Sequence, residues 1–187
     1  LITFTDEVNN SKNEWKFNDG VADLVKLHSG SREVLFDEPI RFTGSSDITV
    51  RNTDGSTHSA TSIVDVALNW SIGEYDASVY GYTNNIYQKE GGTHVQGVRI
   101  ALANTFRSLL DKNKAQFVSG KKKLPDITVD DISEGIILVV SIKIPEPSFS
   151  SQTKEKLTSA EAQRVSNLIT SKELQDWIDR NPSIVKK

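Results

Sequence analysis

Ile136-Ile137-Leu138-Val139-Val140-Ser141-Ile142-Lys143-Ile144 is an almost unbroken apolar run, rich in isoleucine and valine. A strand with one solvated face alternates apolar and polar residues, whereas a strand covered on both faces reads as one continuous apolar segment. The run therefore predicts a central strand that is packed on both sides. Gly135 precedes it and is expected to end a short capped helix over residues 128–134.

A loop with a donor-rich tip leaves this strand. Residues 145–157 contain two prolines and three serines, which favours an irregular segment that carries Gln152, Lys154 and Lys156 outward. Lysine is a compact cation on a flexible stem that suits a terminal phosphate, and glutamine adds a neutral donor. The tip either enters the site of another domain or is a solvated polar loop, and the residues alone favour the solvated loop.

Two helices are expected on either side of the strand in sequence. Thr93 with Gln96, and Thr158 with Glu161, have the spacing of capping boxes. The first helix has a buried stripe that leaves Arg99 toward the exposed side; the stripe comprises Val95, Val98, Leu102, Phe106 and Leu109. The second helix is expected to break near residues 170–171 and to end at residues 181–182.

Gly91-Gly92-Thr93-His94 at the first helix start has two interpretations. Backbone N–H groups at a helix start can bind an anion. A tight turn from strand to helix also needs small residues, and the residues favour this turn. His94 is then a capping or packing residue rather than an acid or base.

The first half of the chain reads as strands. Short strands are expected at 1–5, 15–17, 34–36, 40–42 and 48–50, with a helix over 21–28. Residues 64–70 and 75–81 alternate at period two, which predicts a hairpin. Strands followed by a helix, a buried strand and a final helix predict a two-layer α/β (α+β) fold, with a mixed sheet and helices on one face.

Composition narrows the function classes. A chain of 187 residues suits one sizeable domain, and a net charge of −3 argues against a protein that coats nucleic acid with its whole surface. There is no cysteine, and the three histidines lie far apart, so no metal site is expected. No signal peptide or membrane segment is recognisable. The start at Leu1 without any methionine predicts an internal fragment of a longer chain.

Common catalytic signatures are missing from the sequence. It has no phosphate-binding GxxxxGK[ST], no GxGxxG after a strand, no GxSxG and no HExxH. A self-contained enzyme is therefore disfavoured. The basic run Lys121-Lys122-Lys123 is either a solvated loop or part of a nucleic-acid patch.

Four segments, in this order and spacing, carry a family resemblance. They are residues 84–94 (NNIYQKEGGTH), 97–99 (GVR), 145–147 (PEP) and 151–157 (SQTKEKL). Together they resemble the B-subunit family of bacterial DNA gyrase, which includes the paralogous topoisomerase IV subunit, among type IIA topoisomerases. The resemblance covers nearly the whole chain. Tyr87 and Val98 depart from the usual pattern without affecting the expected fold.

The resemblance implies a transducer domain over residues 1–170 and a linker helix over 171–187 toward the cleavage region. It implies a left-handed β-α-β crossover, an exception to the usual hand. It also implies that Gln152 and Lys154 contact the γ-phosphate of ATP, with Lys154 acting in catalysis, and that Arg99 lines a cavity for DNA. ATP and Mg²⁺ would be bound mainly by an adjacent domain.

The implied activity is that of a cytoplasmic DNA topoisomerase, in which ATP turnover drives strand passage and negative supercoiling. The implied partners are DNA, the gyrase A subunit, and a second copy of the gyrase B chain, with no membrane. The isolated chain is not expected to hydrolyse ATP. Two alternatives stay open: a nucleic-acid-binding module without nucleotide coupling, and the middle domain of a MutL-type ATPase.

Overall fold

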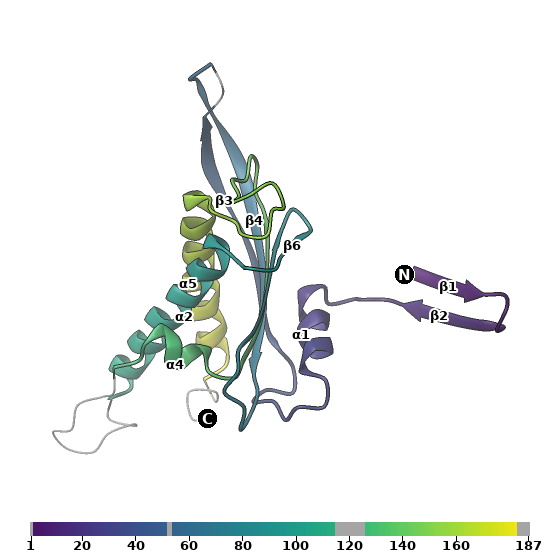
Figure 1. The fold of residues 1–187 in the computed structure, drawn as a ribbon. Helices are drawn as coiled ribbons and strands as arrows, with labels where there is room; N and C mark the ends of the chain where they lie inside the picture. The colour runs from purple at the N-terminus through teal and green to yellow at the C-terminus, as the bar shows by residue number, and fades with distance from the viewer. Residues whose placement is uncertain (1, 52–53, 115–125, 183–187) are drawn as a thin grey trace.

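The computed structural model describes residues 2–51, 54–114 and 126–182 (Figure 1). Its main feature is a five-stranded mixed sheet with the strand order β3-β4-β7-β5-β6. The strands are β3 (Ile40–Arg51), β4 (Thr57–Trp70), β5 (Ser78–Thr83), β6 (Ile86–Gln88) and β7 (Ile136–Lys143).

β7 is the central strand that the apolar run predicts. It pairs with β4 in antiparallel register and with β5 in parallel register. Its even-numbered residues, from Ile136 to Ile142, belong to the larger core cluster, whereas Ile137 and Val139 belong to a second cluster on the other face. From Ile136 to Val140 both faces of the strand are buried, so the alternation normal for a half-exposed strand is absent there.

Helices cover both faces of the sheet, unequally. On one face lie α2 (Thr93–Lys112), α4 (Val129–Ser133) and α5 (Ala160–Arg180), and on the other lies α1 (Val21–Ser29) (Figure 1). Val21 and Val25 of α1 pack against Ile137 and Val139. The predicted α/β fold with a mixed sheet is confirmed, but the expected single helical face is incomplete because α1 covers part of the opposite face.

The predicted hairpin between residues 64–70 and 75–81 is wrong. Residues 64–70 lie in β4 and residues 78–81 lie in β5, but β7 lies between these two strands. Residues 71–77 instead meet the start of β7, where Ser71 N–H donates to Gly135 O at 2.8 Å and Gly135 N–H donates to Tyr75 O at 3.0 Å. β5 and β7 are thus parallel neighbours connected through α2. The hand of this crossover stays a prediction.

The true tight hairpin joins β5 to β6. Thr83 pairs with Ile86, so only Asn84 and Asn85 form the turn, with φ values of 50° and 67°. Two positive φ angles are what a two-residue turn of type I′ requires, and asparagine tolerates them better than most residues. This turn directs the chain toward residues 88–93 at the start of α2.

α5 is one continuous helix, so the expected break near residues 170–171 is wrong. Its buried face includes Ser166, Thr170, Leu174 and Ile178, which follow one another at a spacing of four. Two of these residues are polar and concealed the stripe, while Leu168 is 52% exposed and does not belong to it. The expected division between residues 1–170 and 171–187 therefore falls inside α5.

The backbones of α2 and α5 are in direct contact where the two helices cross. A Cβ atom on Gly97 of α2 would lie 2.4 Å from Gln163 O and 3.1 Å from Asn167 N of α5. Asn167 Nδ2 also donates to Gly97 O at 3.3 Å. Only glycine permits this crossing without displacing one helix.

The first residues form a separate small sheet. β1 (Ile2–Asp6) and β2 (Ser11–Trp15) pair only with each other among the described strands and lie beyond α1 from the main sheet (Figure 1). Phe4 and Trp15 are 55% and 46% exposed. The first strand agrees with the sequence expectation. The second, expected at residues 15–17, lies at residues 11–15 instead and shares only Trp15 with that expectation.

Candidate functional site

The loop after β7 has paired arms rather than an irregular course. Ser150 N–H donates to Lys156 O at 3.0 Å, and Thr158 N–H donates to Ser148 O at 2.8 Å. Phe149 and Leu157 form an antiparallel bridge between the arms. The expectation of an irregular loop holds only for its tip, because the base forms a short antiparallel pair.

The returning arm of the loop also pairs with the segment before α2. Glu90 N–H donates to Glu155 O at 3.0 Å, Leu157 N–H to Gly91 O at 3.1 Å, and Thr93 N–H to Leu157 O at 3.0 Å. We call residues 90–93, 148–150 and 155–158 the three-segment ladder. It holds the loop base on two sides through backbone hydrogen bonds.

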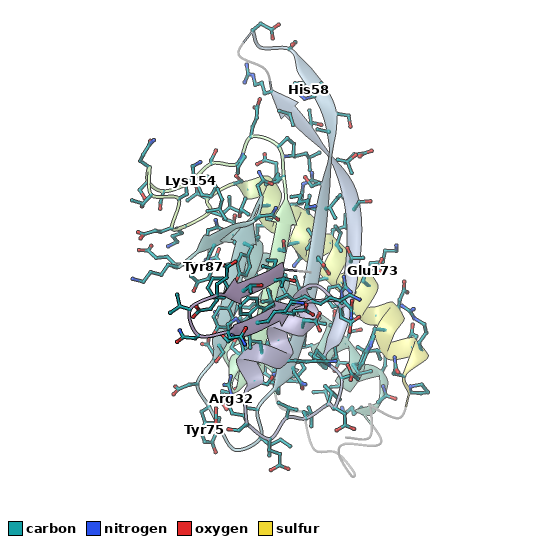
Figure 2. All side chains as sticks on the ribbon, turned by 90° about the vertical axis from the view of Figure 1, so that its right-hand side faces the viewer. Arg32, His58, Tyr75, Tyr87, Lys154 and Glu173 are labelled. Carbon is teal, nitrogen blue, oxygen red and sulfur yellow. The ribbon has the colours of Figure 1, made fainter. Side chains whose placement is uncertain are left out.

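Lys154 projects from the tip above this ladder (Figure 2). Its backbone is left-handed, with φ of 56°, and its N–H donates to Ser151 O at 3.1 Å across the tip. Nζ lies 6.0 Å from the centroid of the Phe149 ring. Both Lys154 and Gln152 are exposed, and Lys154 forms no ion pair with any described carboxylate.

The glycine pair before α2 is a close backbone contact. Gly92 has φ of 146°, and a Cβ atom there would lie 2.4 Å from Leu157 O and 2.6 Å from Leu157 N. Thr93 N–H is already bonded to Leu157 O at 3.0 Å, so it is not free for an anion. Of the two interpretations of this motif, the contacts support the tight turn.

Neither of the two capping boxes at α2 and α5 forms. The Thr93 hydroxyl donates to Ser159 O at 2.7 Å, and the Thr158 hydroxyl donates to Ser148 O at 3.1 Å. Both side chains therefore stabilise the contact between segments instead of the first turn of their own helix. The capped helix expected at residues 128–134 does form, with Thr128 and Asp131 bonded reciprocally.

His94 is a buried packing residue, as expected. It is fully buried, and neither ring nitrogen has a hydrogen-bond partner among the described residues. Burial lowers the pKa of His94 to about 4, so the ring is neutral near pH 7. A neutral imidazole sealed against Gly81 and Val95 has no access to a substrate.

Arg99 lies at a basic hollow beside the three-segment ladder. The hollow has a volume of about 410 Å³, and its lining includes Lys89, Arg99 and Lys156, with Glu90 as the acidic member. Arg99 is half-buried, and its Nε has no hydrogen-bond partner among the described residues. The fold thus brings Arg99 and Lys156 to one hollow, whereas Gln152 and Lys154 stand outside it.

Leu157 is the residue at this site whose role the sequence did not reveal. It is fully buried and joins the larger core cluster with Val95 and Val98. A signal was present: Leu157 is the only large apolar residue between Phe149 and Val165. An isolated leucine at the end of a polar loop indicates that the loop returns to the core.

Three further features from the sequence are the lysine run, metal ligands and membrane segments. Lys121, Lys122 and Lys123 lie outside the described residues. Within the described ranges, no group of three or more His, Cys, Asp or Glu side chains is placed to hold a metal ion. None of the described helices has the length and apolar character needed to cross a membrane.

A family model described as DNA gyrase B matches residues 20–187. The chain belongs to the DNA gyrase B family. It is 34% identical over 173 residues to the DNA gyrase B subunit of Streptococcus pneumoniae, covering 92% of this chain and 24% of that protein. It is 31% identical over 186 residues to the gyrase B subunit of Myxococcus xanthus, covering 100% and 21%. The chain spans about a quarter of the length of these relatives.

Solved structures agree with the family assignment. The 43K ATPase domain of Thermus thermophilus gyrase B, in complex with an aminocoumarin, matches with a TM-score of 0.74 and 25% identity, over 98% of this chain and 44% of that chain. The topoisomerase IV ATP-binding domain of Francisella tularensis matches with a TM-score of 0.66 and 23% identity, over 98% and 44%, which shows a shared fold.

Proposed function

We propose that this chain is the transducer segment of the ATPase subunit of a type IIA DNA topoisomerase of the gyrase kind. In this role it couples ATP hydrolysis in an adjacent domain to DNA strand passage and negative supercoiling. Residues 1–170 form the transducer body and residues 171–187 lead toward the cleavage region. ATP and Mg²⁺ are bound mainly by the adjacent domain.

The observation that carries this proposal is an exposed lysine at the tip of a loop whose two arms are held by backbone hydrogen bonds. Lys154 is exposed and forms no ion pair with any described carboxylate, while backbone hydrogen bonds hold both arms below it. Catalysis of phosphoryl transfer depends mostly on positioning and on stabilising charge. A lysine at such a tip can add one positive charge to a γ-phosphate, and Gln152 can add a neutral donor.

The same contact provides a switch between two states. ATP and ADP differ by the γ-phosphate, so only contacts to that group can favour one domain arrangement over another. In our proposal the bound γ-phosphate draws Lys154 toward the adjacent domain and rotates this segment. The rotation closes a dimer of two gyrase B chains around DNA, with Arg99 facing the DNA cavity.

The assembly that follows contains DNA, two copies of the gyrase B chain, and the gyrase A subunit, and it works in the cytoplasm. An isolated chain supplies only the lysine half of the nucleotide site. It should therefore show no ATP turnover when purified, in an assay with ATP, Mg²⁺ and linear DNA. Measurable turnover by the pure chain would overturn the proposal.

A salt titration separates this role from that of a nucleic-acid-binding module. Binding driven by phosphate neutralisation weakens steeply as salt increases. We expect the isolated chain, with its net charge of −3, to bind duplex DNA weakly even at low salt. Tight and strongly salt-dependent binding would favour the module instead.

A further inference from the structure

Among the contacts of the three-segment ladder, the one between Gly92 and Leu157 is the closest approach of two backbones. The returning arm at residues 155–157 is only one residue away from Lys154, and it bonds to residues 90–93 rather than to a side chain. Leu157 then anchors this arm, because its side chain is fully buried in the main core cluster. A change in the spacing between Gly92 and Leu157 would therefore shift the arm that leads to the tip.

Gly92 permits that spacing. A Cβ atom at this position would lie 2.7 Å or less from three atoms of Leu157, two of which are backbone atoms. Backbone cannot rotate away as a side chain can, so the arm would have to move. The hydrogen bonds on both sides of the contact, Thr93 N–H to Leu157 O at 3.0 Å and Leu157 N–H to Gly91 O at 3.1 Å, would stretch with it.

We propose that Gly92 is a positioning residue for the response to nucleotide, and that it acts by holding Lys154 at the position where Lys154 meets the γ-phosphate. This inference rests on the proposed function and deepens it. A misplacement of about 1 Å at a reacting group can cost about 100-fold in rate. Gly92 therefore keeps Lys154 in place before the nucleotide binds. If the arm below the loop tip were displaced, Lys154 would have to be repositioned each time a nucleotide binds.

The chain contains a matched control for this position. Gly91 also has a positive φ, 67°, but a Cβ atom there would meet only Val95 Cγ2, at 3.8 Å. Gly91→Ala therefore imposes left-handed backbone strain without a clash, whereas Gly92→Ala adds the collision with Leu157. The two variants also differ in backbone strain, because φ of 146° and ψ of −166° at Gly92 are essentially restricted to glycine. A difference between them therefore reports the backbone and the contact particular to Gly92, and not the loss of any glycine in this turn.

The test uses the full-length protein that contains this chain. Affinities for a non-hydrolysable ATP analogue and for ADP are measured in the unchanged protein and in the Gly92→Ala, Gly91→Ala and Lys154→Ala variants. We expect Gly92→Ala to lower the preference for the analogue over ADP by about tenfold or more, by analogy with other misplaced groups. Gly91→Ala should keep that preference, and ADP affinity should hold in all three. A merely structural defect would weaken both ligands equally.

The outcomes separate the inference from the function on which it rests. If Lys154→Ala keeps the preference for the analogue, the γ-phosphate role fails and the inference fails with it. If Lys154→Ala lowers the preference but Gly92→Ala does not, only the inference is overturned. If Gly92→Ala does not fold, Thr93→Val replaces it, because the Thr93 hydroxyl donates to Ser159 O and so ties the residue next to Gly92 to the chain two residues beyond Leu157. An unchanged preference in Thr93→Val then overturns the inference.

Discussion

Lys154 and Arg99 are two cations that lie on opposite sides of one contact, in which the loop arm that ends at Leu157 meets the start of α2. Lys154 stands on an exposed tip and is attached to the core through the arm that ends at Leu157. Arg99 lies on α2, whose first residue is bonded to that arm, and is half-buried at a hollow. The Lys154 ammonium is therefore solvated, whereas the Arg99 guanidinium is already partly desolvated.

Under the proposed function, this difference suits different uses. A solvated lysine is desolvated only when a ligand arrives, which suits a contact that forms and breaks in each ATP cycle. An arginine that shares a hollow with Lys89 and Lys156 keeps a standing positive potential, which suits a long polyanion that passes by. The predictions below test whether the two cations are separable.

The largest expected effect is on ATP turnover. Lys154→Ala in the full-length protein should lower turnover by about 100-fold, the scale of losing one stabilising donor in a transition state. The melting temperature should stay nearly unchanged, because the side chain is exposed and alanine keeps a non-glycine residue at φ of 56°. Steady-state ATPase assays and calorimetry measure the two quantities.

Lys156→Ala is the matched control for that substitution, since Lys156 is an exposed lysine on the same loop but faces the hollow. It should affect turnover much less. Equal losses in both variants would mean that the general charge of the loop matters and not the position of Lys154.

A second substitution disturbs the helix of Arg99 without touching the three-segment ladder. Gly97→Ala forces a Cβ atom to 2.4 Å from Gln163 O, so α2 and α5 must separate. We expect a loss of about 1–3 kcal/mol in the free energy of unfolding, as for other overpacked cores. Chemical denaturation of the chain measures it.

Gly44→Ala provides the comparison, because its Cβ would meet the side-chain atom Ile169 Cγ2 at 2.8 Å, which can rotate. It should cost less than Gly97→Ala. If the two costs are equal, the backbone approach of α2 to α5 is not the limiting contact.

The third prediction concerns pH at the start of α2. The pKa of His94 is lowered to about 4 in the folded chain, against 6.5 for an ordinary histidine. Between these values the unfolded chain binds a proton that the folded chain does not, so stability falls as pH falls through this window. The slope is at most about 1.4 kcal/mol per pH unit for one group. Denaturation at several pH values should show a shallower slope in His94→Gln.

His28 serves as the control for this titration. Partial burial and the charge of Arg32 also lower its pKa, and its ring stacks on Tyr80 at the surface of α1. His28→Gln should therefore change the slope in the same direction but less. An unaltered slope in His94→Gln would contradict the buried neutral state.

The smallest expected effect is at Arg99. Arg99→Gln in the full-length protein should reduce the stimulation of ATPase activity by DNA several-fold, roughly 1 kcal/mol or less for one exposed ion pair with a phosphate. Basal turnover should change little. Arg107→Gln on the same helix is the control, because its guanidinium is already bonded to Ile127 O and Asn104 Oδ1. Equal loss of basal and DNA-stimulated turnover would count against a role facing DNA.

Local patterns predicted the elements that depend on local burial. β7 and α2 follow directly from the apolar run and from the stripe that includes Val95 and Leu102. The hairpin prediction for residues 64–81 failed because a strand distant in sequence is inserted between its two arms. No pattern within those arms reports a partner that comes about 60 residues later.

The geometry of the candidate site could not be predicted from the sequence. The roles that the family resemblance implies for Gln152, Lys154 and Arg99 stay predictions. The contact between Gly92 and Leu157 was missed because glycine before a helix has several explanations and the threonine hydroxyls resembled helix caps. Tertiary hydrogen bonds to Ser159 and Ser148 took those hydroxyls instead.

The continuity of α5 has a mechanical consequence. Ser159, just before this helix, is bonded to both Thr93 and Ser148, and the helix then runs unbroken from Ala160 to Arg180. Its 21 residues span about 30 Å at the usual rise. As a stiff lever arm, the helix would convert a tilt of about 5° near the loop into a displacement of roughly 2.6 Å at its far end. Under the proposed function, a small motion of Lys154 on binding a phosphate would be enlarged with distance along this helix.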